Sequence, residues 1–234
     1  NAVLRTLSCY AKDGLIDATL VPCDAQGRVD PDAFAAAVTE RTVLACLSHA
    51  SNALGTVQDV ESAIRKVRRN NPDTLVLVDA AQTLGHLPID VLALDADLVA
   101  IAGHKGLRGP TGTGALFISE RAYPDDCSRS RVFCERRGGT GAVAPGLDMP
   151  TQLPDALEAG TSNAVGFAGL LAAIEARDEA IRARDHTHEL ALTARLLDGL
   201  GAIRKVRLYG LTGTHGRTPV VLFNLDGIAA RELA

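Results

Sequence analysis

Residues 98–114 read LVAIAGHKGLRGPTGTG, an apolar run that ends in a His–Lys pair and continues into a glycine-rich loop. Apolar runs of this kind recur along the first two-thirds of the chain and alternate with helical patterns. We expect strands at 18–23, 42–50, 74–81, 98–103 and 114–119. Because these runs are apolar on both faces and are separated by helices, they predict a mostly parallel sheet covered on both sides. The predicted fold class is α/β.

The helical patterns have recognisable ends. Residues 30–38 begin with Asp30 as a candidate cap and Pro31 at the first helical position. Residues 59–70 carry apolar residues on one face, with acids early and bases late, as the helix dipole favours. One long helical pattern follows residues 158–163 and runs to about Gly199.

Strands at 205–210 and 219–227 complete the expected elements. We therefore expect a large domain over 1–160 and the start of a smaller α+β domain over 161–234. Residues 121–157 are too polar and too broken for a core element, and long irregular segments in compact domains tend to be functional loops. Both ends have helical patterns that look cut, so we expect a fragment.

Composition limits the partners and the compartment. The formal net charge of −4 gives no reason to expect nucleic acid, and no apolar run is long enough to span a membrane. Five widely spaced cysteines form no C-x-x-C pair and favour core positions over a disulfide framework. His186 and His188 lie in a highly charged helical stretch, which favours a solvated face over a metal site. A cytoplasmic protein without a metal is expected.

Polar residues follow three of the apolar runs directly. Asn52 comes after 42–50, Asp79 lies near the end of 74–81 with Gln82 three residues later, and His104 with Lys105 follows 98–103. Ligands bind at the carboxyl ends of the strands in open α/β sheets. Taken singly, Asp79 could be a helix cap and Asn52 a turn residue. Together, an acid, amides and a lysine suit a pyridine cofactor: the acid keeps the ring nitrogen protonated, and the lysine binds the aldehyde as a Schiff base.

Three segments carry a resemblance to a known family. SHASNALGT (48–56), VDAAQTLGHLPIDV (78–91) and AGHKGLRGPTGTGALFI (102–118) resemble the class V aminotransferases that depend on pyridoxal 5'-phosphate, above all their cysteine desulfurase branch. RGGTG (137–141) and LEAGTSN (157–163) match further segments in the same order. The resemblance covers almost the whole chain and implies the fold-type I PLP-dependent transferase architecture.

The resemblance also assigns roles to matched residues. Lys105 would be the Schiff-base lysine and the base that moves protons at the substrate, and Asp79 would pair with the pyridinium nitrogen. Gln82 would donate to the phenolic oxygen of the cofactor. The residue two before His104 is commonly Ser or Thr in the family, but here it is Ala102. That departure removes one phosphate donor, which costs on the order of 1 kcal/mol.

Three further roles follow from the same resemblance. Asn52 would lie near the phenolic oxygen and the carboxylate of the substrate, and His104 would contact the phosphate. Thr140 would reach the phosphate of a neighbouring subunit, since these enzymes are homodimers with shared active sites. The implied reaction converts L-cysteine to L-alanine and passes sulfur, through an enzyme persulfide, to a sulfur-acceptor protein.

Alternatives remain at this point. None of the five cysteines matches the catalytic cysteine of the desulfurases, which the resemblance places beyond residue 234, although Cys134 lies four residues before GGTG. The family's phosphate loop and ring-stacking histidine would precede residue 1. An aminotransferase, a selenocysteine lyase or an epimerase-like enzyme shares the lysine and the aspartate. A catalytically silent scaffold is a further possibility. A phosphate-loop nucleotide enzyme is rejected, because the order G-x-x-x-x-G-K-[ST] is absent.

Overall fold

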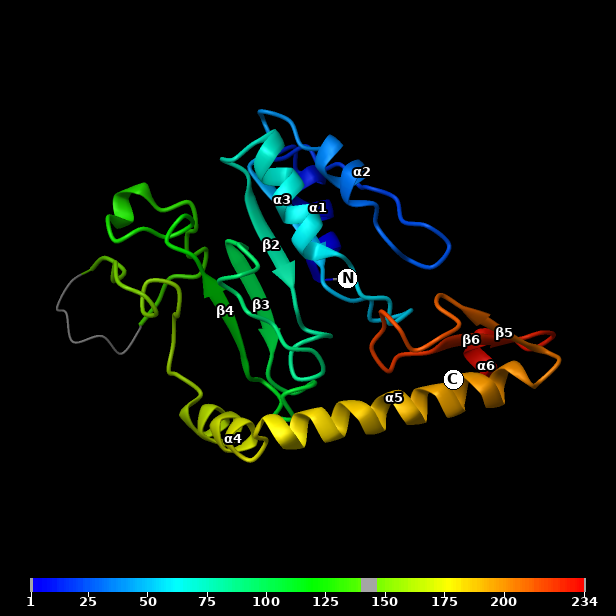
Figure 1. Cartoon of the computed structure of the whole chain (residues 1–234). Coiled ribbons are helices and arrows are strands. Elements are labelled where there is room, and N and C mark those ends of the chain that lie inside the picture. Colours follow the sequence, from blue (N-terminus) through cyan, green and yellow to red (C-terminus); the bar gives the residue numbers. More distant parts are fainter. Residues whose placement is uncertain (1, 140–146, 234) are drawn as a thin grey trace.

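The computed structural model describes residues 2–139 and 147–233. Its centre is a four-stranded sheet in the order β1-β2-β3-β4. The strands are β1 (Leu44–Ser48), β2 (Leu75–Asp79), β3 (Leu98–Ala102) and β4 (Gly114–Ile118). β1, β2 and β3 run parallel, and β4 returns antiparallel to β3 (Figure 1). The expected α/β class with a mostly parallel sheet is confirmed.

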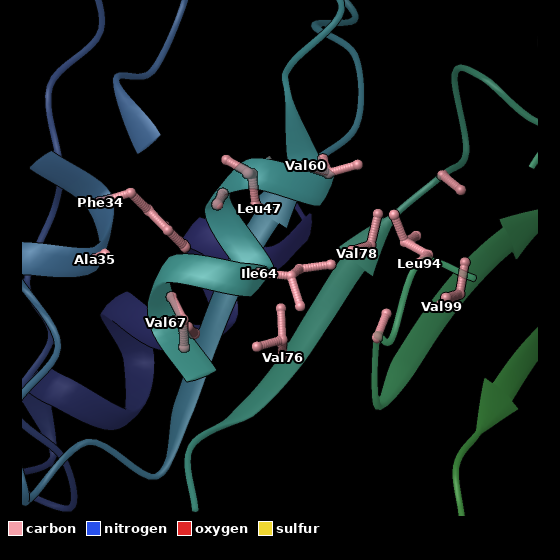
Figure 2. Packing of buried hydrophobic residues seen from close by; sticks show 14 residues of the cluster. Phe34, Ala35, Leu47, Val60, Ile64, Val67, Val76, Val78, Leu94 and Val99 are labelled. Carbon is pink, nitrogen blue, oxygen red and sulfur yellow. The ribbon is translucent and has the colours of Figure 1, made fainter. Parts of the chain in front are cut away.

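Two helices cover one face of this sheet. They are α2 (Pro31–Ala36) and α3 (Val60–Asn70). Asp30 caps α2 by accepting a hydrogen bond from the amide of Asp32, as its sequence predicts. Ile64 and Val67 of α3 are fully buried over Val76 of β2, in the cluster that Figure 2 shows. Full burial of an aliphatic side chain contributes about 1.5–3 kcal/mol. Because the cluster on this face is the larger of the two hydrophobic clusters, this face supplies most of the core.

The other face is covered differently from the prediction. Leu75 and Leu98 pack there against Ala122, which belongs to an irregular segment and not to a helix. Leu44 and Leu116 on the same face are 38% and 45% exposed. Helix α1 (Ala2–Lys12) has no buried residue. In the described part of the chain, helices therefore cover one face of the sheet, and the second face stays partly open.

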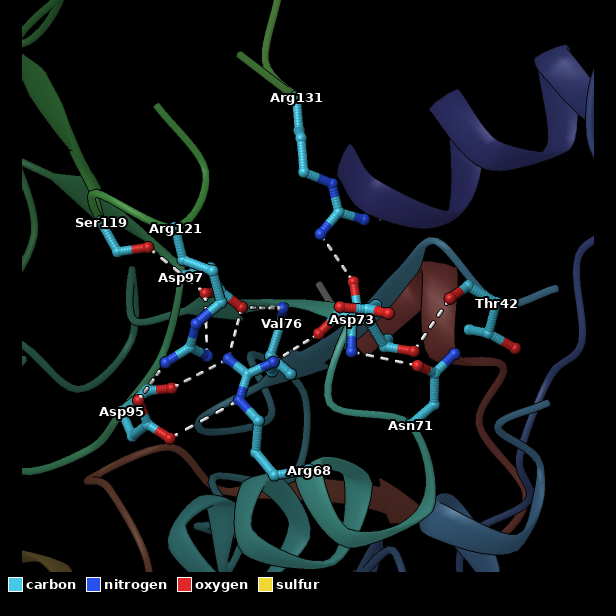
Figure 3. A network of polar contacts seen from close by, with 11 residues as sticks. Thr42, Arg68, Asn71, Asp73, Val76, Asp95, Asp97, Ser119, Arg121 and Arg131 are labelled. Atoms are coloured by element: carbon cyan, nitrogen blue, oxygen red, sulfur yellow. Dashed lines mark hydrogen bonds and ion pairs between the residues drawn. The ribbon is translucent and has the colours of Figure 1, made fainter. Parts of the chain in front are cut away.

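A buried ionic network fixes the amino ends of β2 and β3 (Figure 3). Asp97 is fully buried and accepts a hydrogen bond of 2.6 Å from the amide of Val76. Arg68 of α3 lies 2.5 Å from one oxygen of Asp97, and Arg121 lies 3.2 Å from the other. Because a buried carboxylate needs such partners, the network ties α3 and residue 121 to the sheet edge opposite the predicted site.

Two predicted elements differ from the structure. Residues 18–23 form no strand, and only Cys23 makes an isolated bridge, to Val29. Leu20 in this run is 70% exposed. The hydrophobicity of the run was therefore not sufficient to predict a strand, which also needs a neighbouring strand to pair with. The long helix after residue 163 is two helices, α4 (Ala164–Glu175) and α5 (Glu179–Gly201). Asp178 caps α5 through the amide of Ile181, which explains the break.

The remaining elements lie at the far end of α5 (Figure 1). β5 (Val206–Tyr209) and β6 (Leu222–Leu225) form an antiparallel pair, followed by α6 (Ala230–Leu233). Within 121–139 and 147–157 the only regular element is a short 3-10 helix, η1 (Cys127–Arg129), so the irregular segment is as predicted there. None of the described helices combines the length and apolarity that a membrane span requires.

Candidate active site

The carboxyl ends of the three parallel strands meet at one edge of the sheet. Ser48 is the register partner of Asp79, and Asp79 is the partner of Ala100. The amide of His49 donates to the carbonyl of Asp79 at 2.9 Å, which extends the β1–β2 ladder by one residue. Asp79 is half-buried and follows Leu75 and Leu77 on the more open face of the sheet. The structure therefore places this carboxylate at the centre of the edge.

A short turn after Asp79 carries Gln82. Oδ1 of Asp79 accepts a hydrogen bond of 3.0 Å from the amide of Ala81, whereas no hydrogen bond to Oδ2 is found in the described residues. Gln82 is half-buried, and the next residue, Thr83, is fully buried. The Thr83 hydroxyl lies 3.0 Å from Nδ1 of His49. The turn is thus fixed at both ends, and Oδ2 of Asp79 and the Gln82 amide make no hydrogen bond among the described residues.

His49 is a member of this edge that the sequence did not single out as functional. Its imidazole links the end of β1 to the Gln82 turn through Thr83. Burial lowers the pKa of His49 below its ordinary value, and the charge of Glu61 opposes that shift. The imidazole of His49 is therefore neutral at neutral pH, and its hydrogen bond with Thr83 stabilises the turn.

The Lys105 loop begins at the end of β3. The amide of Gly103 donates to the carbonyl of Thr113 at 3.0 Å, and the amide of Gly109 donates to the carbonyl of Gly103 at 2.8 Å. The amide of Arg108 donates to the carbonyl of Lys105 at 2.8 Å. These bonds close the loop on itself, while the side chains of His104 and Lys105 are exposed. The amine of Lys105 is therefore accessible on a fixed backbone.

Gly85 and Gly106 bring the Gln82 turn and the Lys105 loop together. A Cβ placed on Gly85 would overlap the carbonyl group of Gly106, and a Cβ on Gly106 would overlap the carbonyl oxygen of Leu84. Gly85 also has φ of +93°, which favours glycine for a second reason. The backbones of the two segments are hence in direct contact. Gln82 and Lys105 therefore belong to the same edge of the sheet as Asp79, which we call the rim.

The turn that carries Asn52 is anchored from the far end of the chain. The Ser51 hydroxyl oxygen accepts a hydrogen bond from the amide of Leu54 at 3.1 Å. The amide of Thr218 donates to the carbonyl of Gly55 at 2.8 Å, and the Arg217 guanidinium donates to the carbonyl of Leu54 at 3.5 Å. The side chain of Asn52 is exposed. Residues 217–218 thus position this turn beside the end of β1.

Similarity to known proteins identifies the family of this chain. The family model described as aminotransferase class V matches residues 2–234. The chain belongs to the class V aminotransferase family.

Named relatives within the family are cysteine desulfurases, as the resemblance predicted. A probable cysteine desulfurase of Methanothermobacter thermautotrophicus is 38% identical over 94% of this chain and 53% of its own length. A cysteine desulfurase structure from Thermococcus onnurineus has a TM-score of 0.81 and 30% identity, over 97% of this chain and 55% of that one. One from Escherichia coli has a TM-score of 0.77 and 28% identity, over 96% of this chain and 53% of that one. The chain spans about half the length of these relatives.

Several expectations for this class V chain concern residues away from the rim. Thr140 lies outside the described residues. The thiol of Cys134 lies 2.6 Å from the carbonyl oxygen of Arg136, in the irregular segment. His188 is exposed, as expected for a solvated helix face, but His186 is half-buried and lines a cavity of about 290 Å³ with His215. No three potential metal-ligating side chains gather among the residues that the structure describes.

Sequence reasoning missed a group of polar residues that contact the rim from outside. Arg177, in the break between α4 and α5, donates to the carbonyl of Gly106, and Glu189 of α5 lies 2.8 Å from Nδ1 of His86. Asp185 lies 3.3 Å from both Arg177 and Arg108. In the sequence these residues belong to a charged helix, which on its own indicates a solvated face. Only their positions against the loops distinguish them.

Proposed function

We propose that the protein containing this chain is a pyridoxal 5'-phosphate-dependent cysteine desulfurase. It would convert L-cysteine to L-alanine: the Cβ–S bond breaks, the sulfur passes to a cysteine thiolate of the enzyme, and Cβ takes up a proton. The persulfide formed would then be passed to a sulfur-acceptor protein. The observation that carries the proposal is the backbone contact of Gly85 with Gly106, which joins Gln82 and Lys105 beside Asp79. The names of the relatives support the same reaction.

The residues at this rim fit the cofactor chemically. Oδ2 of Asp79 has no hydrogen bond from the described residues and offers negative charge for a protonated ring nitrogen. Gln82 provides a neutral amide donor, His104 an exposed imidazole, and Lys105 an exposed primary amine. Ala102 contributes no side-chain donor, so phosphate binding would depend on the remaining groups. The donor set matches an aldehyde-bearing pyridine with an anionic substituent.

Each residue of the rim would have a separate task. When bound, the cofactor supplies an electron-accepting ring that stabilises negative charge at the carbon next to the amino group. Asp79 would hold the proton on the ring nitrogen. Lys105 would attach the aldehyde, for which its ammonium must first lose a proton, and would then move protons at the substrate. Gln82 and Asn52 would orient the ring oxygen and the substrate carboxylate.

The wider organisation is part of the proposal. Residues 1–160 would belong to the large cofactor-binding domain and 161–234 to the start of the small domain, because β5 and β6 form a sheet of their own. The protein would be a homodimer in which Thr140 reaches the phosphate in the neighbouring subunit. We place it in the cytoplasm, and five free cysteines in the described residues support a reducing compartment.

Absorbance of the purified protein tests the cofactor. With added pyridoxal 5'-phosphate the wild-type protein should turn yellow, and reduction with borohydride should fix the cofactor mass on the peptide containing Lys105. Lys105→Ala should stay colourless, whereas Lys66→Ala, which removes the surface pair with Asp32, should behave as wild type. A colourless wild-type protein would contradict the proposal and favour a silent scaffold.

Product analysis tests the reaction. The whole protein given L-cysteine and a reductant should release alanine and sulfide in equal amounts without any amino-group acceptor. If turnover requires a 2-oxo acid as acceptor, the protein is a class V aminotransferase instead. If selenocysteine alone is converted, the lyase alternative holds.

A further inference from the structure

Arg177 occupies the break between α4 and α5, at the point where the two rim loops meet. Its guanidinium donates from Nη1 to the carbonyl of Gly106 at 2.6 Å and from Nη2 to the carbonyl of Gly85 at 3.5 Å. Its side chain is only 11% exposed. Figure 1 shows β3 running toward the start of α5. One planar cation therefore contacts both loops.

The two carbonyls belong to residues that lie close in the sequence to Lys105 and Gln82. Gly106 directly follows Lys105, and Gly85 lies three residues after Gln82. The two loops touch through glycine backbone, which has no side chain to interlock. A guanidinium is a rigid fork of donors, so it can fix the separation of two carbonyls, as one ammonium with a flexible stem cannot. Arg177 supplies this restraint.

Helix α5 in turn holds Arg177 in place. Oδ2 of Asp185 lies 3.3 Å from Arg177 Nη2 and 3.3 Å from Arg108 Nη2. Arg108 is itself part of the Lys105 loop, since its amide donates to the carbonyl of Lys105. One turn further along, Glu189 pairs with His86 of the other loop at 2.8 Å. Both loops are thus bound to the same helix.

The charge of Asp185 suits this arrangement. Burial alone raises the pKa of its carboxyl, but the hydrogen bond from Arg184 and the charges of Arg108, Arg177 and Arg184 outweigh burial and leave the pKa below its ordinary value. The carboxylate is therefore ionised at neutral pH, and its negative charge attracts the guanidinium groups of Arg108 and Arg177.

We propose that Arg177 is a positioning residue for Lys105, which sets the amine against the Gln82 turn by bridging the carbonyls of Gly106 and Gly85. The inference rests on the proposed function, because it concerns the lysine that would attach the cofactor. Arg177 would act through the backbone and would not touch the substrate.

The test compares Arg177→Met with Arg177→Lys in the full protein. Arg195→Met is the control, because Arg195 is an exposed arginine of α5 and makes no hydrogen bond or ion pair among the described residues. The rate of cofactor attachment to Lys105, measured by absorbance and confirmed by borohydride reduction, should fall on the order of tenfold to hundredfold in Arg177→Met. Arg177→Lys should recover part of the rate, and Arg195→Met should match wild type.

Two readouts separate positioning from simple loss of structure. Affinity for pyridoxine 5'-phosphate, which lacks the aldehyde, should stay within about twofold of wild type, because Arg177 would act on Lys105 and not on the binding pocket. A tenfold loss of affinity would instead mean that about 1.4 kcal/mol of binding free energy is lost from the pocket itself. The pH midpoint of the lysine-bound absorbance band should shift in Arg177→Met only. Unchanged attachment, or equal losses of attachment and of pyridoxine 5'-phosphate affinity, would overturn the inference.

Amide hydrogen exchange keeps the inference distinct from the proposed function. Without cofactor, Arg177→Met should speed exchange at the amides of Arg108 and Gly109, which close the Lys105 loop. Arg195→Met should leave those amides as in wild type. Should the wild-type protein never bind the cofactor, the proposed function fails, while faster exchange in Arg177→Met still supports the bridge and unchanged exchange overturns it.

Discussion

Gly85 and Gly106 lie with their backbones in direct contact, so neither position has room for a Cβ. This contact joins a turn that follows β2 to a loop that follows β3. It links the segments that carry Gln82 and Lys105, and it depends on residues that have no functional group.

Gly85→Ala should therefore damage the site without changing any candidate cofactor ligand. The positive φ of Gly85 alone makes alanine unfavourable by about 1–3 kcal/mol, and the overlap with Gly106 adds to this. We expect lower stability in urea and weaker cofactor absorbance. Gly199→Ala on α5 is the control, since no atom lies within 4 Å of an added Cβ there, and it should raise stability by about 0.5–1 kcal/mol. Equal behaviour of the two variants would refute the importance of the contact.

Asp97→Asn should destabilise the fold while leaving the site chemistry unchanged. Asp97 is fully buried and pairs with Arg68, so loss of its charge leaves a guanidinium 13% exposed without its nearest carboxylate. Breaking one partner of a buried pair costs about 3–5 kcal/mol. Glu61→Gln, which removes the exposed pair with Arg65, should cost less than about 1 kcal/mol. Urea unfolding of both variants, each compared with wild type, measures the difference.

His49 should make stability fall as the solution becomes acidic. Its folded pKa is lowered by burial, so between the folded and the unfolded pKa the unfolded chain binds the extra proton. Stability is therefore lost as pH falls below the unfolded value near 6.5 and stops changing below the folded pKa. His49→Gln should flatten this part of a plot of unfolding free energy against pH. An unaltered slope in His49→Gln would contradict the assignment.

Arg217→Met should loosen the Asn52 turn from a distance. Arg217 is 3% exposed and donates to the carbonyls of Leu211 at 2.6 Å, Leu54 and Val220. Hydrogen bonds to a charged donor contribute about 1.5–3 kcal/mol each, so we expect a loss of about 3 kcal/mol or more.

Amide exchange at Thr218, whose amide donates to the carbonyl of Gly55, reports whether Arg217→Met loosens the turn. Exchange there should be faster in Arg217→Met and unchanged in Arg204→Met, which alters an exposed arginine without a contact in the described structure. Equal exchange in both variants would mean that Arg217 does not hold the turn.

The pattern of short apolar runs predicted the sheet well and one strand wrongly. Residues 74–81 and 98–103 became β2 and β3 because both faces of each run are apolar and each run has a neighbour to pair with. Residues 18–23 have similar hydrophobicity but find no neighbouring strand in the described chain. Backbone pairing requires a partner, and hydrophobicity within one segment contains no information about it.

The helical pattern after residue 163 shows a similar limit. Its composition favours helix throughout, and the capping role of Asp178 could have been read from its type and its position before Glu179. What could not be read is that Arg177, one residue earlier, is turned toward Gly106. A charged residue at a helix start has the same appearance in a sequence whether it faces solvent or a buried carbonyl.

The residue types that end the strands could be identified from the amino-acid sequence. Because parallel strands present their carboxyl ends at one edge, Asp79, Gln82 and Lys105 were expected on a common rim. How that rim is held is visible only in the folded chain: the backbones of Gly85 and Gly106 are in contact, and Arg177, just before α5, bridges their carbonyls. This difference arises because strand order follows from local hydrophobic pattern and chain connectivity. The glycine contact instead joins loops that follow different strands, and the Arg177 bridge joins residues more than 70 positions apart; no local pattern encodes either proximity.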